Sequence, residues 1–186
     1  MAKVYHCKLG ANLVPTFAAL MADVNAELQK VVNRSEDGLI DATVHIRRTT
    51  EDKVPRTPVD VGNLRASWFG VTRKGSVPDT VGSGSFRSNP ETGVKAEKMA
   101  ADHRSLVGEA RAMTGGKDPV SIMGFSAFYA APVHEMEGAD FTGKNARGSS
   151  RRRSRRPGAG PKYLETHVYE EKDEIIRIVA KRAKIK

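Results

Sequence analysis

The sequence predicts an α+β fold in which a small antiparallel sheet packs against a long N-terminal helix and a long C-terminal helix, with extended loops. Three observations carry this prediction. One apolar stripe at helical spacing lies near the N-terminus, a second lies at the C-terminus, and two short runs rich in aromatic and β-branched residues lie between them. At 186 residues the chain suits one domain and is short for two, so we expect residues 1–186 to form a single domain.

The first predicted elements are a short strand and a long helix. Alternating apolar and polar residues favour a strand over residues 3–9. A stripe with the period of a helix follows, and it consists of Phe17, Leu20, Met21, Val24, Leu28 and Val31. The stripe blurs near residue 34 and resumes at Leu39. Two alternatives stay open: one helix to about residue 48, or two helices with a kink near Gly38.

A compact turn is predicted after this helix. Pro58 fixes its own φ and disfavours helical geometry at Thr57, so the helix should end before it. Asp60 is a good N-cap for one helical turn that ends near Arg65, and Gly62 permits a close backbone approach. The residues that follow, 67–73, predict a strand.

The second half of the chain predicts loops, one further strand and the closing helix. Residues 75–93 have the composition of a loop, 94–113 favour a helix of low apolar content, and 120–125 favour a strand. Residues 128–136 fit a short helix or an extension of that strand. The closing helix begins after Pro161, with acidic residues early and basic residues late, as the helix dipole favours; its apolar side consists of Leu164, Val168, Ile175, Ile178 and Val179.

The charge of the chain is concentrated in one segment. Residues 141–162 contain eight Lys and Arg and no acidic residue, so they carry +8 of the net +9 and leave +1 for the remainder. Most of these charges lie in the low-complexity stretch 138–160, which we expect to be a basic flexible loop. The sequence therefore predicts a balanced globular body with one cationic loop.

No constellation in the sequence predicts catalysis, a cofactor or a metal site. His134-Glu135 lacks the second His, four residues on, that a zinc protease needs, because position 138 is Gly. Cys7 is the single cysteine; it excludes an internal disulfide, fits a reducing compartment and favours a buried small side chain over a nucleophile. No apolar run approaches the roughly 18 residues of a membrane span. We therefore expect no enzyme, no cofactor and no membrane contact.

Three segments together resemble one protein family. The turn Thr57-Pro-Val-Asp-Val-Gly-Asn-Leu-Arg-Ala-Ser-Trp68 resembles the Pro-Val-Asp-Thr-Gly-x-Leu-Arg-x-Ser signature of the tail-completion (neck, head–tail joining) proteins of long-tailed double-stranded DNA phages, the HK-ninety-seven gp-ten-like family. Residues 127–138 look like its Tyr-Ala-x-x-Val-Glu-x-Gly box. Residues 158–164 look like its Arg-Pro-Phe-Leu opening of the last helix.

The resemblance covers roughly residues 10–73 and 119–184, so residues 74–118, a loop and a helix, look like an insertion. The chain departs from the family pattern at three points. Val61 stands where Thr is usual, Met136-Glu137 separates Glu135 from Gly138, and Lys162-Tyr163 stands where the family has Phe.

The resemblance implies a structural virion protein. It would form a homo-oligomeric ring, with six copies as the usual expectation, at the neck between the DNA-filled head and the tail. Its partners would be head-closure or adaptor proteins and tail terminator or tube proteins, and it would assemble in the cytoplasm of the bacterial host. Non-specific contact with packaged DNA is a further expectation of this kind.

Three groups of residues are expected to carry this role. The first packs subunits together and consists of Leu64, Trp68, Phe69, Tyr129, Pro132, Tyr163, Leu164 and Val168. The second is a structural ion pair between Arg65 and Glu135. The third is the basic loop, which contacts DNA or an acidic partner surface and consists of Arg147, Arg151, Arg152, Arg153, Arg155 and Arg156.

One alternative function comes from another class. An Arg-rich arm also fits a protein that binds nucleic acid without regard to sequence. A dedicated binder usually spreads its basic residues over a folded face, whereas here the body is nearly neutral. Charge localisation therefore favours the neck protein, and the nucleic-acid binder stays as the alternative.

Overall fold

A computed structural model describes residues 13–59, 62–79, 84–90, 93–116, 118–138, 141 and 156–184. Its elements, in chain order, are α1 (Leu13–Asp52), α2 (Asn63–Ala66), β1 (Trp68–Thr72), β2 (Gly75–Ser76), α3 (Ala96–Met113), β3 (Ser121–Phe125), α4 (Ala130–Glu135), α5 (Glu165–Glu170) and α6 (Lys172–Ala183). The predicted α+β class, with a small antiparallel sheet and long helices at both ends of the chain, is confirmed. The expected strand at 3–9, with Cys7, lies outside the described residues, as does Asp60.

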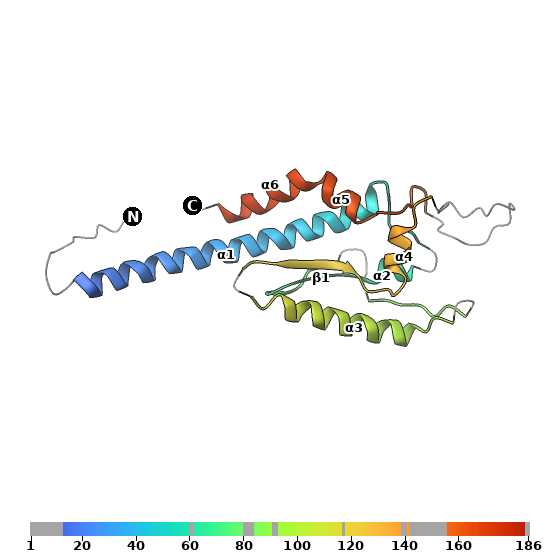
Figure 1. Cartoon of the computed structure of the whole chain (residues 1–186), viewed down its shortest axis with the longest axis horizontal. Coiled ribbons are helices and arrows are strands. Elements are labelled where there is room, and N and C mark those ends of the chain that lie inside the picture. Colours follow the sequence, from blue (N-terminus) through green and yellow to red (C-terminus); the bar gives the residue numbers. More distant parts are fainter. Residues whose placement is uncertain are drawn as a thin grey trace.

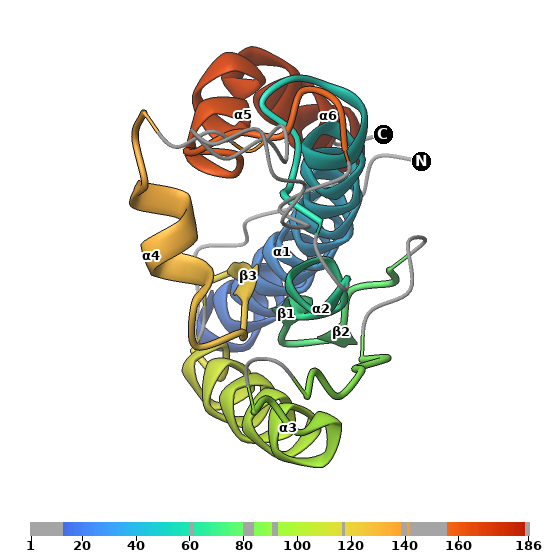
Figure 2. The ribbon, with the colours of Figure 1, turned by 90° about the vertical axis from the view of Figure 1, so that its right-hand side faces the viewer.

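The body consists of stacked layers (Figures 1 and 2). α5 and α6 lie on one side of α1, the sheet lies on its other side, and α3 covers the far face of the sheet. The C-terminal helices therefore pack against α1. Residues 74–118, expected as an insertion, supply β2 and α3 and so form one wall of the body.

α1 is one continuous helix of 40 residues, so the alternative of two helices kinked near Gly38 is wrong. Gly38 allows α1 to pack closely against α6 and does not interrupt the helix. A Cβ at this position would lie 2.8 Å from the Cα of Val179 and 3.3 Å from the Cβ of Arg182, both in α6. The missing side chain lets the two helix backbones approach each other at this point.

The sheet has the order β2-β1-β3, and both pairings are antiparallel. All five residues of the central strand β1 are buried because helices cover both faces of the sheet. Alternate residues point to opposite faces. Gly70 faces Thr43 of α1, whereas Phe69 and Val71 pack with Ala110 of α3. The strand predicted at 67–73 thus forms at 68–72, between two helical layers.

The turn before β1 forms as one short helix, α2. Gly62 stands at its N-cap with φ 90°, in the left-handed region where glycine is favoured. Asn63 links this turn to the loop that contains Arg87. Its side-chain amide donates to the backbone oxygen of Arg87 at 2.7 Å, and its side-chain oxygen accepts from the Arg87 N–H at 2.8 Å. The region predicted as a short helix or strand extension at 128–136 is helical, as α4.

The closing helix is interrupted once. α5 and α6 are separated at Glu171, whose carboxylate accepts a hydrogen bond from His45 Nε2 at 2.9 Å and contacts the ammonium of Lys53. His45 lies on α1 and Lys53 directly follows it, so this carboxylate fixes the C-terminal helices on α1. Arg182, near the end of α6, adds a pair with Asp41 at 2.6 Å.

The close approach at Gly38 yields the first prediction. Gly38→Ala should lower the free energy of unfolding by about 1–3 kcal/mol, because the added methyl group meets the backbone of Val179. Gly108→Ala is the matched control: it lies inside α3 and its Cβ meets nothing within 4 Å. This control should gain about 0.5–1 kcal/mol from helix propensity. Chemical denaturation measures both; equal effects of the two substitutions would contradict the close packing.

Candidate functional site

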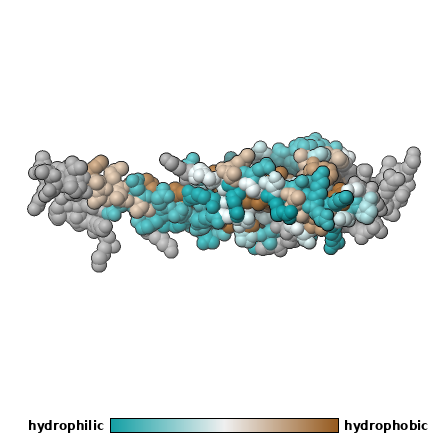
Figure 3. All heavy atoms as spheres, turned by 90° about the horizontal axis from the view of Figure 1, so that it is seen from below, coloured by the Kyte–Doolittle hydropathy of each residue, from teal (hydrophilic) through white to brown (hydrophobic). Residues whose placement is uncertain are grey.

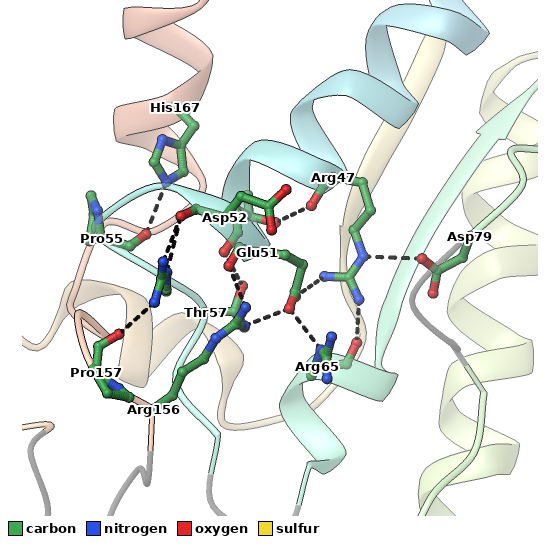
Figure 4. A network of polar contacts seen from close by, with 12 residues as sticks. Arg47, Glu51, Asp52, Pro55, Thr57, Arg65, Asp79, Arg156, Pro157 and His167 are labelled. Atoms are coloured by element: carbon green, nitrogen blue, oxygen red, sulfur yellow. Dashed lines mark hydrogen bonds and ion pairs between the residues drawn. The ribbon is translucent and has the colours of Figure 1, made fainter.

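A buried ionic cluster lies directly beneath the turn that the sequence singles out. Arg47 of α1 is 1% exposed, and its guanidinium donates in three directions (Figure 4). Nη1 donates to Glu51 Oε1 at 2.8 Å, Nε to Asp79 Oδ1 at 3.2 Å, and Nη2 to the backbone oxygen of Arg65 at 2.9 Å. Burial lowers the pKa of Arg47, and the neighbouring carboxylates of Glu51 and Asp79 oppose that shift.

Glu51 is the centre of this cluster. Its carboxylate is buried and lies against three guanidinium groups: those of Arg47, of Arg65 at 2.7 Å and of Arg156 at 2.5 Å. The contact with Arg65 is an ion pair without a well-aligned hydrogen bond, because the Nε–H bond of Arg65 is not directed at the Glu51 oxygen. We name these residues the Glu51 cluster: Arg47, Glu51, Arg65, Asp79 and Arg156.

The cluster connects segments that are far apart in the sequence. Arg47 and Glu51 lie on α1, Arg65 on α2, Asp79 in the loop after β2, and Arg156 just before the C-terminal helices. Backbone contacts reinforce the last of these connections. The Arg56 N–H donates to Gly158 O at 2.8 Å, and Arg56 Nη1 donates to Pro157 O at 3.2 Å.

The three segments that carry the family resemblance meet in one apolar cluster. Leu64 comes from the turn, Ala127 and Ala130 from the second segment, and Tyr163 from the third. The ring of Tyr163 packs edge-on against Phe125, and its hydroxyl donates to Ala130 O at 3.3 Å. Burial raises the pKa of the Tyr163 hydroxyl above its ordinary value. The sequence does not predict this convergence from spacing alone.

This burial corrects part of the predicted subunit-packing set. Leu64, Trp68, Phe69 and Tyr163 are at most 9% exposed within the single chain, so they form its own core and do not face a second subunit. The others lie nearer the surface: Pro132 is exposed, and Tyr129, Leu164 and Val168 are half-buried. Subunit packing by these four stays a prediction.

The predicted ion pair between Arg65 and Glu135 is wrong. Arg65 pairs with Glu51, as above, whereas Glu135 pairs with Lys162 and accepts from His134 Nδ1 at 2.8 Å. The two sequence segments do lie close together, but apolar side chains join them and the charged groups point to other partners. Lys162 and, secondarily, His134 lower the pKa of Glu135.

One group of side chains in the described part of the chain has spacing that suits a metal ion: His134, Glu135 and Glu165, whose ligand atoms lie within 4.8 Å of one another. The ammonium of Lys162 already lies between the two carboxylates, in contact with Glu135 and 3.1 Å from Glu165. The trio is thus balanced by an internal cation, and we assign it a role in fixing the start of α5 beside α4.

The basic loop is only partly described. Arg147, Arg151, Arg152, Arg153 and Arg155 lie outside the described residues. Arg156, predicted to contact DNA or a partner, instead contacts the carboxylate and the backbone oxygen of Glu51, and its side chain is 21% exposed. Its charge is used inside the molecule, where it fixes the end of the basic segment to α1.

An exposed apolar surface lies on the N-terminal part of α1. We call residues 13–32 the overhang, because α6 and the sheet cover α1 only from about Asn33 onward. Every residue from Phe17 to Lys30 except Asp23 is exposed. The large apolar residues among them are Phe17, Leu20, Met21, Val24 and Leu28, with Phe17 at 61% and Leu28 at 56% exposed. Figure 1 shows the overhang as a single helix that extends beyond the wider body, and in Figure 3 the molecule is narrower toward the same end.

A second exposed apolar group lies at the opposite end of the molecule. Phe128, Pro132 and Met136 follow one another at four-residue steps along α4 and its flanks. Phe128 is 72% exposed and Met136 is 45% exposed. α4 and the overhang lie at opposite ends of the long axis (Figure 1), so exposed apolar side chains are present at both ends.

Comparisons of this chain with family models, with curated proteins and with solved structures find no significant match. Among the helices of the described residues, none combines the length and the apolar character needed to cross a membrane.

The Glu51 cluster yields a stability prediction. Glu51→Gln should lower the free energy of unfolding by about 3 kcal/mol, because three guanidinium groups lose a buried charge partner. Asp37→Asn is the control: it also removes one carboxylate of α1, but from an exposed pair with Lys74, and should cost less than about 1 kcal/mol. Equal losses in urea denaturation would contradict a special role for Glu51.

Glu171 yields a pH-dependent prediction. Lys53, and secondarily His45, lower the pKa of Glu171 below its ordinary value of 4.5. A carboxylate with a lowered folded-state pKa stabilises the fold above its unfolded-state pKa, and that contribution is lost as the pH falls through the folded-state pKa. Glu171→Gln should therefore destabilise the protein at pH 7, and the difference from wild type should shrink below about pH 4. Thermal unfolding across pH measures it; a difference independent of pH would contradict the assignment.

Proposed function

We propose that this chain is a structural subunit of the neck of a tailed double-stranded DNA phage, where copies of it form a ring that joins the head to the tail. The observation that carries the proposal is the exposed apolar face of the overhang, from Phe17 to Leu28. Monomeric soluble proteins rarely leave a long contiguous apolar face in water, so such a face marks a contact with another chain.

The distribution of exposed apolar residues supports a connecting role. The overhang lies at one end of the long axis, and Phe128 and Met136 lie at the other. A subunit of a connector needs contact surfaces toward different neighbours. Copies form a ring when two different surfaces of the subunit meet and the rotation from one copy to the next adds up to a full circle. Contacts at both ends of an elongated subunit meet that requirement.

The family resemblance supports the same role. The segments 57–68, 127–138 and 158–164 come together through Leu64, Ala130 and Tyr163, so the resemblance concerns one coherent part of the structure. In the resembling family this part belongs to a small α+β subunit of a ring, with head-closure proteins on one side and tail proteins on the other. We extend that assignment, with a virion location and six copies, to this chain as part of the proposal.

The basic segment has a defined place in this proposal. Arg156 holds its C-terminal end on Glu51 of α1, and the backbone of Gly158 and Gly160 pairs with Arg56 just after α1, so the remaining arginines start from a fixed point on the body. They would contact either DNA in the channel or an acidic face of a neighbouring ring. Arg156 does not take part, since it already neutralises Glu51.

The decisive experiment removes the chain from the phage that encodes it. A phage without this chain should accumulate DNA-filled heads and separate tails, visible by electron microscopy, and supplying the chain should restore joined particles. Joined, infectious particles in the absence of the chain would contradict the neck role.

The nucleic-acid-binding alternative makes a different prediction. Deletion of residues 147–155, which spares Arg156, should abolish binding to double-stranded DNA under the alternative but leave ring formation intact under the neck role. Native mass spectrometry and a salt titration of DNA binding separate the two. Full function in head–tail joining without residues 147–155 would further show that the basic segment is dispensable there.

A further inference from the structure

We infer that copies of this chain exchange a strand: residues 3–9 of one copy add to the open edge of β3 in another copy, as a fourth strand of its sheet. The sequence predicts a strand at 3–9, and this segment lies outside the described residues. The occupant of the edge is thus a named segment of a second copy. This contact does not depend on the neck function.

β3 is the terminal strand of the sheet on the side away from β2. The strand order is β2-β1-β3, and Figure 2 shows β1 between the other two. The main neighbours of β3 among the described elements are β1 and α1. All five residues of β3 are half-buried, whereas all five residues of β1 are buried. One long edge of β3 therefore has no neighbouring strand in the described part of the chain.

The register shows which backbone groups face this edge. The Ser126 N–H donates to Ser67 O at 2.8 Å, so residues 67 and 126 form a hydrogen-bonded pair, and so does every second pair along the β1–β3 ladder. Met123 and Gly70 form one of the pairs in between, and Gly70 O instead accepts from Val77 N–H on the β2 side at 2.8 Å. The N–H and C=O groups of alternate β3 residues thus point away from β1; these residues are Ser121, Met123 and Phe125.

These outward backbone groups form no hydrogen bond with any other described residue. Such an edge is a template for a further strand, and proteins usually protect it with a charge, a proline or a bulge. β3 has the sequence Ser-Ile-Met-Gly-Phe, without charge or proline, and its pairing with β1 runs without interruption. The opposite edge of the sheet is β2, which has two residues and is too short to hold a strand. β3 is therefore the edge that can receive one.

Residues 3–9 have the pattern of a strand at the edge of a sheet. Tyr5, Cys7 and Leu9 are apolar and alternate with His6 and Lys8. Because alternate side chains of a strand point to opposite faces, one face of the added strand would be apolar and the other polar. The segment is long enough to pair along the whole of β3.

This segment cannot reach β3 of its own copy. The end of β3 nearer to the overhang lies beside Thr43 of α1, because the hydroxyl groups of Ser121 and Thr43 are 2.7 Å apart. Thr43 comes 30 residues after Leu13 in one continuous helix, which is a distance of about 45 Å. The extended chain from Leu13 back to Leu9 spans at most about 14 Å, and even Lys3 lies within about 35 Å of Leu13.

The overhang therefore determines that the exchange occurs between copies. It carries residues 3–9 beyond their own body, so a β3 edge within their reach belongs to another copy. The donor segment and the acceptor edge are different parts of the chain, and each copy can give one strand and receive one. Copies joined in this way close into a ring, of which a pair that exchanges strands reciprocally is the smallest.

The first test measures the mass of the purified full-length chain by analytical ultracentrifugation. Wild type should associate as its concentration rises. Met123→Pro removes an N–H that faces the open edge and keeps the hydrogen bonds to β1, so it should weaken association more than about tenfold. Met123→Ala removes the same side chain but keeps the N–H, and it should associate as wild type does. Thermal unfolding of both variants checks that the body is folded.

The second test combines a blocked acceptor with a blocked donor. Tyr5→Pro together with His6→Pro removes the N–H that faces β3 in either register of the added strand, because neighbouring N–H groups point to opposite edges. At a concentration at which this donor-blocked variant and Met123→Pro are each monomeric, their mixture should form a heterodimer and nothing larger. The intact segment 3–9 of one variant then meets the intact edge of the other.

The third test reads the contact within the strand by amide hydrogen exchange. The N–H groups of Met123 and Phe125 should exchange slowly in associated wild type and fast in the donor-blocked variant. The N–H groups of Ile122 and Gly124 face β1, so they should be protected in both proteins. Protection that alternates along β3 in this way distinguishes an added strand from association through any other surface.

Four results would overturn the strand exchange: a wild-type monomer at all concentrations, association of Met123→Pro equal to that of wild type, a mixture of the two blocked variants that stays monomeric, or exchange of Met123 and Phe125 that is the same in associated wild type and in the donor-blocked variant. The phage deletion tests the neck role separately. Loss of head–tail joining without strand exchange would support the neck role alone, and strand exchange in a chain that joining does not need would support the exchange alone.

Discussion

The carboxylate of Glu51 holds the molecule together at the point where most of its segments meet. Three arginines from α1, α2 and the segment before α5 share this one buried carboxylate. The cluster, together with the carboxylate of Glu171, holds the C-terminal half of α1 between the sheet and the C-terminal helices. Those layers end near Asn33, so the N-terminal half of the same continuous helix extends away from the body. The part of α1 that carries these ion pairs is covered by other elements, and the part before Asn33 is surface.

Much of this architecture could be predicted from the sequence, because it depends on local patterns. The period of the stripe from Phe17 onward predicts α1, and Pro58 predicts its end before the turn. What could not be predicted depends on contacts between distant segments. In the sequence Gly38 suggests a break in the helix, because its role in the close approach of α1 to Val179 of α6 has no local signal. The spacing of Arg47 and Glu51 is typical of a surface pair on a helix, and nothing local indicates that the pair is buried. The same reason explains why the predicted pair of Arg65 and Glu135 is wrong, because the nearness of two segments does not determine where each side chain points.

Amide hydrogen exchange of the overhang as a function of protein concentration tests the central claim most directly, because a helix gains most of its stability in water from packing against other elements. The account predicts slow exchange for the amides of residues 17–31 in concentrated protein and fast exchange after dilution, while the amides of β1 and of the C-terminal half of α1 stay protected throughout. Exchange of residues 17–31 at a rate independent of concentration would contradict the claim that another chain completes this half of α1.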